Sequence, residues 1–249
     1  MSSNNGRTAI VTGASKGLGA GIAKSLAEAG AAVVVNYRSD AEGAARVVAD
    51  ITAKGGRATA VQADVADGED VHRLFDRARA AYGPVDVLVN NAGVGTFVPL
   101  SDITEAQFHS ETTTNLLGTI LTTQALAAQD DIEAASIINV STSGTVSHPP
   151  DASLYVASKS AVNAFTIVAS KELGPRGIRV NAIMPGPSDT DGTRAMGYSG
   201  SEREAQAIAA TPLGRTGTPD DYGPLVAFLA SDDACWITGD LILASGGLR

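Results

Sequence analysis

The chain has 249 residues, 44% of them hydrophobic and 18% charged, which are the proportions of a folded globular protein rather than a disordered one. Its formal net charge of −9 argues against nucleic acid or an anionic membrane surface as the main partner. No run approaches the about 20 apolar residues of a membrane span, and residues 1–5 contain no apolar signal core, so we expect no membrane partner and a cytoplasmic location.

A glycine-rich turn follows the first predicted strand, the short apolar run of residues 8–12. Gly13, Gly17 and Gly19 come next, and apolar residues at helical spacing then continue to Gly30, a natural helix end. Between a strand and a helix, bare backbone lets a pyrophosphate approach the helix N-terminus, where free N–H groups favour an anion. The turn therefore predicts a dinucleotide phosphate site.

The tip of the second strand, residues 32–36, informs the choice of cofactor. A fold that prefers NAD usually carries an acidic residue here for the ribose 2′-OH, but the chain continues Tyr37-Arg38-Ser39. Arg38 can bind a 2′-phosphate as a planar bidentate donor, and Lys16 adds a second positive charge. We predict NADP(H). The alternative is that Arg38 only pairs with Asp40 or Glu42 on the surface, a contact worth little.

Helices and strands alternate through the next segment. The pattern predicts a helix over residues 41–54, a strand over 57–62, a helix around 71–78 and a strand over 85–89. This alternation is typical of an α/β doubly wound (Rossmann) parallel sheet, with about seven strands flanked by helices and ligands at the strands' carboxyl ends. We find no linker or repeat and expect a single domain over residues 1–249.

Polar residues occur at these expected carboxyl ends. Asp64, followed by Val65, is placed to meet an adenine amino group or to cap a turn. Asn90 and Asn91 can tie neighbouring strand ends together through their side-chain amides. Ala92 and Gly93 follow, and the glycine allows close approach of a ligand to the backbone.

The second half of the chain continues the pattern. Residues 105–128 are expected to be mostly helical, with Asn115 near the middle, where a buried amide needs partners. Strands are expected over residues 136–140, 178–183 and 241–244, and further helices over 201–210 and 220–230. The single cysteine, Cys235, lies between Ala234 and Trp236 and is expected to be a small buried hydrophobe. The three histidines are far apart, so we expect no metal site.

Tyr155 and Lys159 lie four residues apart in another predicted helix and therefore on one helix face. A nearby cation favours the phenolate and lowers the pKa of a tyrosine from its ordinary value of about 10. Such a tyrosine can act as a general acid or base near neutral pH. The alternative is a pair of solvated surface neighbours.

Four motifs occur together in a fixed order: Thr12-Gly13-x-x-x-Gly17-x-Gly19, Asn90-Asn91-Ala92-Gly93, Tyr155-x-x-x-Lys159 and Pro185-Gly186. With them the chain resembles the short-chain dehydrogenase/reductase family over nearly its whole length, and within it an NADP-preferring, carbonyl reductase or 3-oxoacyl-reductase-like branch. The resemblance implies an oxidoreductase that passes a hydride between NADP(H) and a ketone, an aldehyde or a secondary alcohol. The alternatives are an NAD-preferring alcohol dehydrogenase and a non-catalytic dinucleotide-binding regulator.

The resemblance also implies a role for each matching residue. Tyr155 would exchange a proton with the substrate, Lys159 would lower the pKa of Tyr155 and hold the nicotinamide ribose, and Asn115 would keep a water in a proton relay. The family usually has Ser thirteen residues before the Tyr, and this chain has Thr142, which keeps the hydroxyl but adds a methyl group. We expect Thr142 to orient the substrate, with Ser141 as the alternative.

The remaining implications concern the cofactor, the substrate and assembly. Residues 187–210 would form a substrate lid, with Met196 and Tyr198 as candidate substrate contacts, and the chain would form a homo-oligomer, a tetramer or a dimer. The residues expected to contact the cofactor are Gly13, Ser15, Lys16, Gly17, Leu18, Gly19, Tyr37, Arg38, Ser39, Asp64, Val65, Asn91, Ala92, Gly93, Tyr155, Lys159, Pro185, Gly186 and Thr190.

Overall fold

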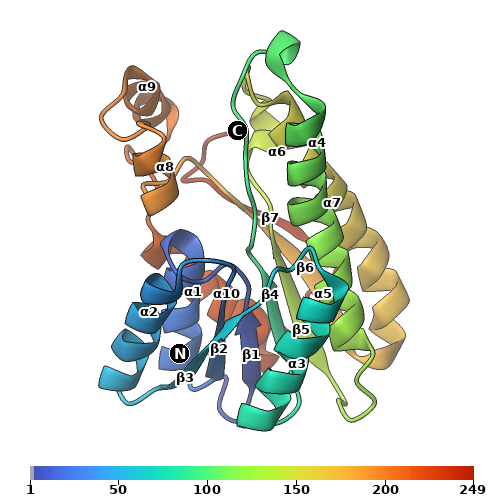
Figure 1. The fold of residues 1–249 in the computed structure, drawn as a ribbon. Coiled ribbons are helices and arrows are strands. Elements are labelled where there is room, and N and C mark those ends of the chain that lie inside the picture. Colours follow the sequence, from blue (N-terminus) through green and yellow to red (C-terminus); the bar gives the residue numbers. More distant parts are fainter. Residues whose placement is uncertain (1–2) are drawn as a thin grey trace.

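Seven strands, all paired in parallel, form the centre of the computed structural model, which describes residues 3–249 (Figure 1). Met1 and Ser2, which the sequence analysis included in the domain, lie outside the described residues. The spatial order is β3-β2-β1-β4-β5-β6-β7. The strands are β1 (Thr8–Val11), β2 (Ala32–Tyr37), β3 (Arg57–Gln62), β4 (Val87–Asn90), β5 (Ala135–Val140), β6 (Ile178–Pro185) and β7 (Leu241–Ala244).

Helices cover both faces of this sheet (Figure 1). Along β1, Ala9 and Val11 join a core cluster with α1 (Gly17–Glu28), α2 (Ala41–Ala53) and α10 (Pro219–Ala230). Ile10 joins a second cluster, on the other face, with α3 (Gly68–Tyr82), α5 (Gly118–Ala127) and α7 (Ser153–Leu173). Successive side chains of a strand point to opposite faces, so a strand buried on both faces must be apolar throughout. The helices are α1 (Gly17–Glu28), α2 (Ala41–Ala53), α3 (Gly68–Tyr82), α4 (Glu105–Glu111), α5 (Gly118–Ala127), α6 (Gly144–Ser147), α7 (Ser153–Leu173), α8 (Asp191–Ala195), α9 (Glu202–Ala210) and α10 (Pro219–Ala230).

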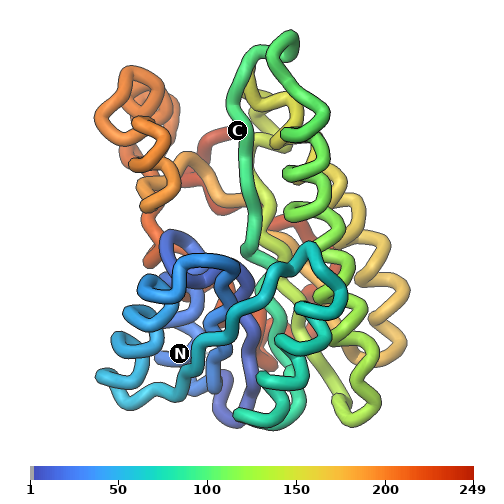
Figure 2. Tube along the Cα trace, viewed as in Figure 1, coloured from blue at the N-terminus to red at the C-terminus, as the bar shows by residue number. Residues whose placement is uncertain are grey.

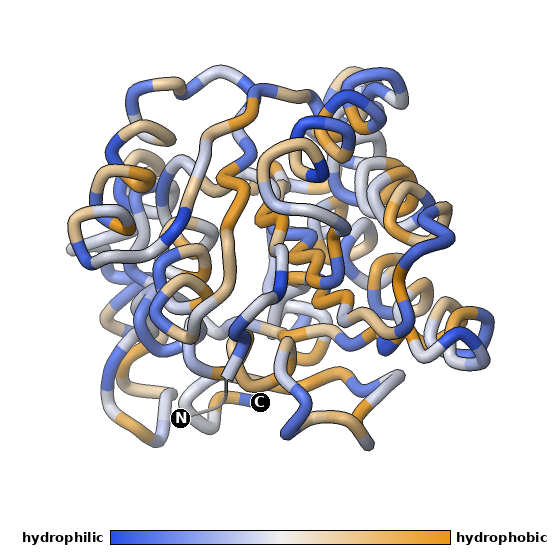
Figure 3. The backbone as a smooth tube through the Cα atoms, turned by 90° about the horizontal axis from the view of Figure 1, so that it is seen from below, coloured by the Kyte–Doolittle hydropathy of each residue, from blue (hydrophilic) through white to orange (hydrophobic). Residues whose placement is uncertain are grey.

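This arrangement confirms the predicted single doubly wound domain. Seen from below, the strongly hydrophobic residues concentrate on the central strands, and hydrophilic residues occur mostly on the outer segments (Figure 3). The chain winds outward from β1 in both directions, because β2 lies on one side of β1 and β4 on the other. At such a switch point the two connections diverge above the carboxyl ends and leave room for a ligand.

The helix predicted over residues 105–128 is interrupted. Residues Thr112–Leu117 form a π-helix between α4 and α5, and Asn115 lies inside it. Three successive threonines lose side-chain freedom in a regular helix, and here the Thr112 hydroxyl donates to the Phe108 carbonyl at 2.7 Å. The wider turn places Asn115 where its side chain can bind another segment of the chain, as described below.

Cys235 is exposed, so the expectation of a buried cysteine is wrong. It follows the short 3-10 turn Asp232–Ala234, of which only Ala234 reaches the core. Trp236, the next residue, is 97% exposed. The sequence analysis judged this stretch by its apolar neighbours, but a turn after the end of α10 directs these side chains outward. Among residues 3–249, no helix combines the length and the apolar character needed to cross a membrane.

Candidate active site

The turn between β1 and α1 packs tightly against the segment that follows β4. Gly13 has a φ of 60°, and a Cβ atom on it would lie 2.9 Å from the Cα of Ala92. A Cβ atom on Gly19 would lie 2.8 Å from the Gly13 carbonyl oxygen. Glycine is therefore required at both positions, since any side chain would push the two segments apart.

The first N–H groups of α1 point toward this turn and have no capping side chain from Lys16. The amide of Gly17 instead donates a hydrogen bond to the carboxylate of Asp191, from the segment beyond β6, at 3.0 Å. A carboxylate at a helix N-terminus is an anion bound by backbone N–H groups and the helix dipole. Ser15 and Leu18 are partly exposed beside it, and Lys16 is exposed.

Asn90 and Asn91 tie strand ends together, as predicted. The Asn90 amide donates to the side-chain oxygen of Asn139 on β5 at 2.9 Å. The Asn91 amide donates to the carbonyl oxygens of Thr12 and Gly13, at 2.9 and 3.1 Å. These bonds fix the glycine turn relative to the segment after β4.

Thr12 and Asn36 complete this frame, and the sequence analysis gave neither of them a role. The Thr12 hydroxyl accepts hydrogen bonds from the backbone N–H groups of Asn91 and Ala92, both at 3.0 Å. The side-chain oxygen of Asn36, at the end of β2, accepts from the Gly13 amide at 3.1 Å. Both are buried polar residues at strand ends, which is the signal that could have identified them.

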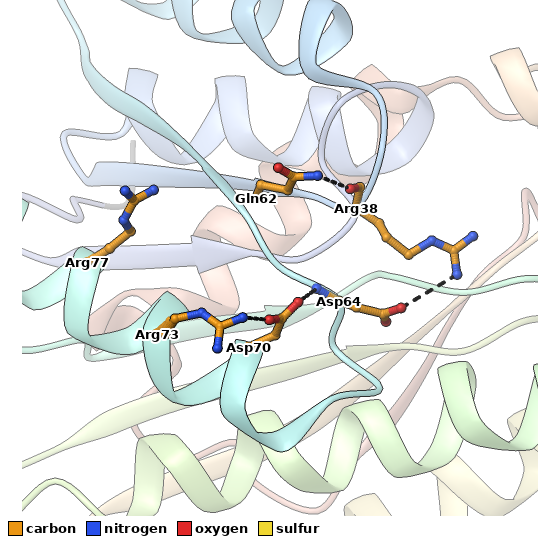
Figure 4. Close-up of a pocket in the computed structure, with 6 residues that line it drawn as sticks. All are labelled: Arg38, Gln62, Asp64, Asp70, Arg73 and Arg77. Atoms are coloured by element: carbon orange, nitrogen blue, oxygen red, sulfur yellow. Dashed lines mark hydrogen bonds and ion pairs between the residues drawn. The ribbon is translucent and has the colours of Figure 1, made fainter.

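A pocket of about 400 Å³ opens beside the ends of β2 and β3 (Figure 4). The Arg38 guanidinium lies 3.9 Å from the carboxylate of Asp64, and its side chain is 61% exposed. Asp64 also accepts a hydrogen bond from the Ala66 amide at 3.0 Å, so it caps a turn as one alternative held. The residues lining the pocket are Arg38, Gln62, Asp64, Asp70, Arg73 and Arg77.

Arg38 does not make the surface pair that the sequence analysis weighed against NADP. Asp40 instead caps α2 by accepting from the Gly43 amide at 2.9 Å, and Glu42 lies 3.9 Å from Arg46. Tyr37 is partly exposed and Ser39 is exposed beside Arg38. The Arg38 guanidinium thus remains available to an anionic group, because a 3.9 Å ion pair between exposed partners is weak.

Tyr155 and Lys159 lie on α7 next to the end of β5. The Lys159 ammonium donates to the Val140 carbonyl at 2.8 Å and is 5% exposed. The Ser141 hydroxyl donates to the Lys159 carbonyl at 3.3 Å, whereas the Thr142 hydroxyl accepts from the Gly144 amide at 3.1 Å and lies close enough to Tyr155 to favour ionisation of the phenol. Of the two candidate hydroxyls, that of Thr142 therefore lies with the phenol, and that of Ser141 is used to join β5 to α7.

The pKa of Tyr155 differs from the sequence-based expectation. Burial raises the pKa of Tyr155 to about 12, against an opposing hydrogen bond with Thr142 and with a further increase from the charge of Glu111. Burial lowers the pKa of Lys159 to about 8, and Glu111 acts in the opposite direction. The structure thus differs from the prediction that Lys159 lowers the tyrosine pKa, because burial dominates and the ammonium is directed at the Val140 carbonyl.

Asn115 is completely buried and has the partners that a buried amide needs. Its side-chain oxygen accepts from the Val94 amide at 2.8 Å, and its nitrogen donates to the Val94 carbonyl and to the Ser158 hydroxyl, both at 2.9 Å. A Cβ atom on Gly93 would lie 3.2 Å from both the Asn115 side-chain oxygen and the Lys159 ammonium. The structure thus brings Asn115, Lys159 and the segment after β4 together.

The remaining predicted residues lie around the same edge of the sheet. The Pro185 carbonyl accepts from the Ser143 amide at 2.8 Å, and the Gly186 amide donates to the Ala244 carbonyl at 3.0 Å. Thr190 caps α8 by accepting from the Thr193 amide at 3.2 Å, and its Cβ lies 3.7 Å from the position that a Cβ atom on Gly17 would take. Val65 is buried, with an exposed fraction of 6%.

Two further residues at this edge, Asp191 and Glu111, were missed by the sequence analysis. Asp191 directly follows the predicted Thr190, and Glu111 lies four residues before Asn115, the spacing that brings two side chains to one face of a regular helix. Within residues 3–249, no three His, Cys, Asp or Glu side chains gather in a group that could hold a metal ion.

Comparisons with known proteins identify relatives of this chain over nearly its whole length. A family model described as enoyl-(acyl carrier protein) reductase, adh_short_C2, matches residues 13–249. An uncharacterized oxidoreductase of Methylorubrum extorquens is 51% identical over 249 residues, covering 100% of both chains.

Two solved structures of short-chain and hydroxysteroid dehydrogenases superpose closely on the whole chain. A short-chain dehydrogenase of Burkholderia cenocepacia in complex with NADP is 36% identical, with a TM-score of 0.91 and coverage of 98% of both chains. A 7α-hydroxysteroid dehydrogenase in complex with NADH and 7-oxoglycochenodeoxycholic acid is 32% identical, with a TM-score of 0.93 and coverage of 99% of this chain and 97% of the other.

Proposed function

Because the chain belongs to the short-chain dehydrogenase/reductase family, we propose that it transfers a hydride between NADP(H) and a ketone, an aldehyde or a secondary alcohol. The observation that carries this proposal is the meeting of Tyr155, Thr142 and Lys159 with the glycine turn at one edge of the sheet. When bound, the nicotinamide cofactor would supply or accept the hydride.

The chain's own residues fit such a cofactor. The glycine turn offers bare backbone and the open N-terminus of α1, which suits a pyrophosphate. Asp191 already accepts a hydrogen bond there, so the site has the chemistry of an anion cradle. Arg38, exposed at the pocket beside β2, would bind the 2′-phosphate of NADP(H), and Tyr37 and Ser39 flank it.

NADP(H) preference is tested by titrating the protein with NADPH and NADH in parallel while following nicotinamide fluorescence. We expect Arg38→Ala to weaken NADPH binding at least about tenfold, since a charge-assisted bond to phosphate is lost, and to leave NADH binding nearly unchanged. Arg46→Ala, on the exposed face of α2, is the matched control. Equal or tighter binding of NADH by the wild-type protein would instead favour the alternative, an NAD-preferring alcohol dehydrogenase.

During carbonyl reduction, Tyr155 would give its proton to the oxygen that becomes an alkoxide as hydride arrives. Because the pKa of Tyr155 is about 12, the phenol is protonated at neutral pH and is ready to donate. Thr142 would donate a second hydrogen bond to the same oxygen and stabilise its developing charge. Lys159 would hold the nicotinamide ribose, and Asn115 would keep a water behind Lys159.

The proton-donor role is tested with Tyr155→Phe, which keeps the ring that contacts Phe97 and removes only the hydroxyl. We expect turnover of a panel of ketones and aldehydes to be lost while NADPH binding stays within about twofold. Unchanged turnover would overturn the assignment. If the wild-type protein bound the cofactor and turned over no carbonyl or alcohol, the rival proposal of a non-catalytic regulator would gain.

Thr142 and Ser141 are separated by a matched pair of variants. Thr142→Val keeps the shape of the side chain and removes the hydroxyl, and we expect kcat to fall about 10²–10³-fold, as for loss of one oxyanion donor. Ser141→Ala removes a bond to the Lys159 carbonyl and should change kcat far less. A larger loss with Ser141→Ala would reverse the assignment.

We also propose that residues 187–210 form a substrate lid. Neither α8 nor α9 contains a buried residue, and the two helices project from the body of the domain (Figure 1). Arg203 on α9 lies 3.2 Å from Asp151, which precedes the helix bearing Tyr155, so an ion pair links the segment to the site. Met196 and Phe97, 57% and 45% exposed, suit an apolar substrate such as a medium-sized hydrophobic carbonyl.

Assembly into a homo-oligomer, a tetramer or a dimer, is supported by the outer face of α7. Ile167 and Val168 are 37% and 52% exposed, whereas Phe165 on the same helix packs on the core. Apolar side chains left outward on a helix favour contact with a second copy. Multi-angle light scattering of the wild-type protein and of Val168→Glu would test this, and a monomeric wild-type protein would contradict it.

A further inference from the structure

Glu111, the last residue of α4, is a carboxyl group in the interior beside the candidate site. It is 1% exposed. One carboxyl oxygen, Oε1, accepts a hydrogen bond from the Thr96 amide at 2.6 Å. The other, Oε2, is buried and has no hydrogen-bond partner among residues 3–249. Burying a carboxylate with an unpaired oxygen costs free energy, so its presence calls for an explanation.

The Thr96 bond fixes a segment that runs alongside α4 after leaving β4 (Figure 2). Asn115 holds the same segment two residues earlier, through both the amide and the carbonyl of Val94. Glu111 and Asn115 therefore both hold residues 93–97 in place, through hydrogen bonds to the backbone of Thr96 and Val94. Since all three bonds are partly buried, they hold this segment more firmly than exposed bonds would.

Residues 93–97 pack against one side of the Tyr155 ring. A Cβ atom on Gly95 would lie 3.0 Å from Cδ2 of the Tyr155 ring, and the Phe97 ring centroid is 5.3 Å from that of Tyr155. A Cβ atom on Gly93 would lie 3.2 Å from the Lys159 ammonium. Displacing residues 93–97 would thus move the surface against which the Tyr155 ring rests.

The carboxyl group of Glu111 also acts electrostatically on both Tyr155 and Lys159. The other charged or titratable groups on the surrounding elements have partners or face solvent: His109 pairs with Glu105, Asp151 pairs with Arg203, and Asp102 and His148 are exposed. β5 and β6 direct no carboxylate at the pair.

We propose that Glu111 is a positioning residue for proton transfer at Tyr155: it holds residues 93–97 against the tyrosine ring and keeps a negative charge beside the Tyr155–Lys159 pair. The proposal rests on the proposed oxidoreductase function. The negative charge opposes formation of the phenolate and favours the ammonium form of Lys159. Glu111 thereby keeps the pair in the protonated form that donates to a carbonyl, and so favours reduction at neutral pH.

The test is the pH dependence of kcat for Glu111→Gln, measured for carbonyl reduction and for oxidation of the product alcohol. The glutamine oxygen can still accept from the Thr96 amide, so the main change is the loss of charge. We expect both limbs of the profile to move to lower pH by about one pH unit, because phenolate and neutral amine each form more easily. The KM for the cofactor should not change.

Glu105→Gln is the matched control, because it removes the same charge from an exposed position of the same helix. Its profile should coincide with that of the wild-type protein. If Glu111→Gln does not fold, Glu111→Asp replaces it. The shorter side chain keeps the charge but no longer reaches the Thr96 amide. We therefore expect a lower kcat, with both limbs of the pH profile at their wild-type positions. Moved limbs in the aspartate variant would overturn the electrostatic part of the proposal.

Failure of this inference can be told apart from failure of the proposed function. If Tyr155→Phe is inactive and the Glu111→Gln profile matches that of the wild-type protein, with only a lower melting temperature, then Glu111 is merely structural and the inference is wrong. If Tyr155→Phe retains full turnover, the proposed function itself is wrong, whatever Glu111→Gln does.

Discussion

Asp86 lies at the opposite end of the sheet from the candidate site, and its titration makes a quantitative prediction about stability. It directly precedes β4 and accepts a hydrogen bond from the Thr8 amide at 2.9 Å. Burial raises its pKa from the ordinary value of 3.8 to about 6, against opposing effects of the Arg7 charge and the Thr8 amide. The folded protein therefore holds a proton on Asp86 at pH values where the unfolded chain has released it.

The direction in which stability changes with pH follows from this difference in pKa between the folded and the unfolded chain. Protonated Asp86 contributes stability that is fully present below pH 3.8 and is lost as the pH rises through about 6. A displacement of about two pH units corresponds to about 3 kcal/mol. Because Asp86 is partly exposed, we discount this value and expect about 1–2 kcal/mol of unfolding free energy to be lost between pH 4 and pH 7.

The perturbation is Asp86→Asn, which cannot ionise but keeps an oxygen for the Thr8 amide. We expect the variant and the wild-type protein to have nearly equal unfolding free energies at pH 4, and the variant to be about 1–2 kcal/mol more stable at pH 7. Urea unfolding followed by circular dichroism at several pH values measures both, and Asp233→Asn, at an exposed position, is the control. A difference that does not vary with pH would refute the reasoning.

Three further substitutions test the frame around the site. Asn115→Ala should lower the unfolding free energy by about 2–4 kcal/mol in urea unfolding, because the buried Val94 amide and carbonyl lose their partner; a loss under 1 kcal/mol would mean that water replaces it. Asp191→Asn should tighten NADPH binding about two- to fivefold in a fluorescence titration, since a carboxylate no longer competes for the Gly17 amide; weaker binding would make Asp191 a supporting residue. Gly13→Ala should abolish NADPH binding and lower the melting temperature, because its φ of 60° and the adjoining backbone exclude a side chain; a normal melting curve would contradict the close approach.

The fold could be predicted from the sequence because each element carries its own local pattern. The apolar strands, the glycine after the first helix and the regular alternation of strand and helix all indicate the same architecture. The π-helix at Thr112–Leu117 could not be predicted, because its register depends on the contact of Asn115 with Val94, which is distant in sequence. Cys235 was misjudged for a similar reason, since the direction of a turn decides exposure more than the character of adjacent residues does.

The candidate site could be predicted only where motif spacing specifies it. The glycine turn and the Tyr155–Lys159 pair belong to this group. Adjacent hydroxyls differ only in direction, so sequence could not choose between Ser141 and Thr142, and the structure separates them by their partners. The electrostatics of the pair also escaped prediction, because burial and the charge of Glu111 come from distant segments.

The π-helix limits the changes in chain length that this part of the protein can accept. A wide turn contains one residue more than an α-helical path would need. Deleting one residue from Thr112–Leu117 would let α4 and α5 join as one regular α-helix. Asn115 would then lose the local position from which it binds the Val94 amide and carbonyl. We therefore expect homologous chains to tolerate substitutions in this stretch far more readily than changes in its length.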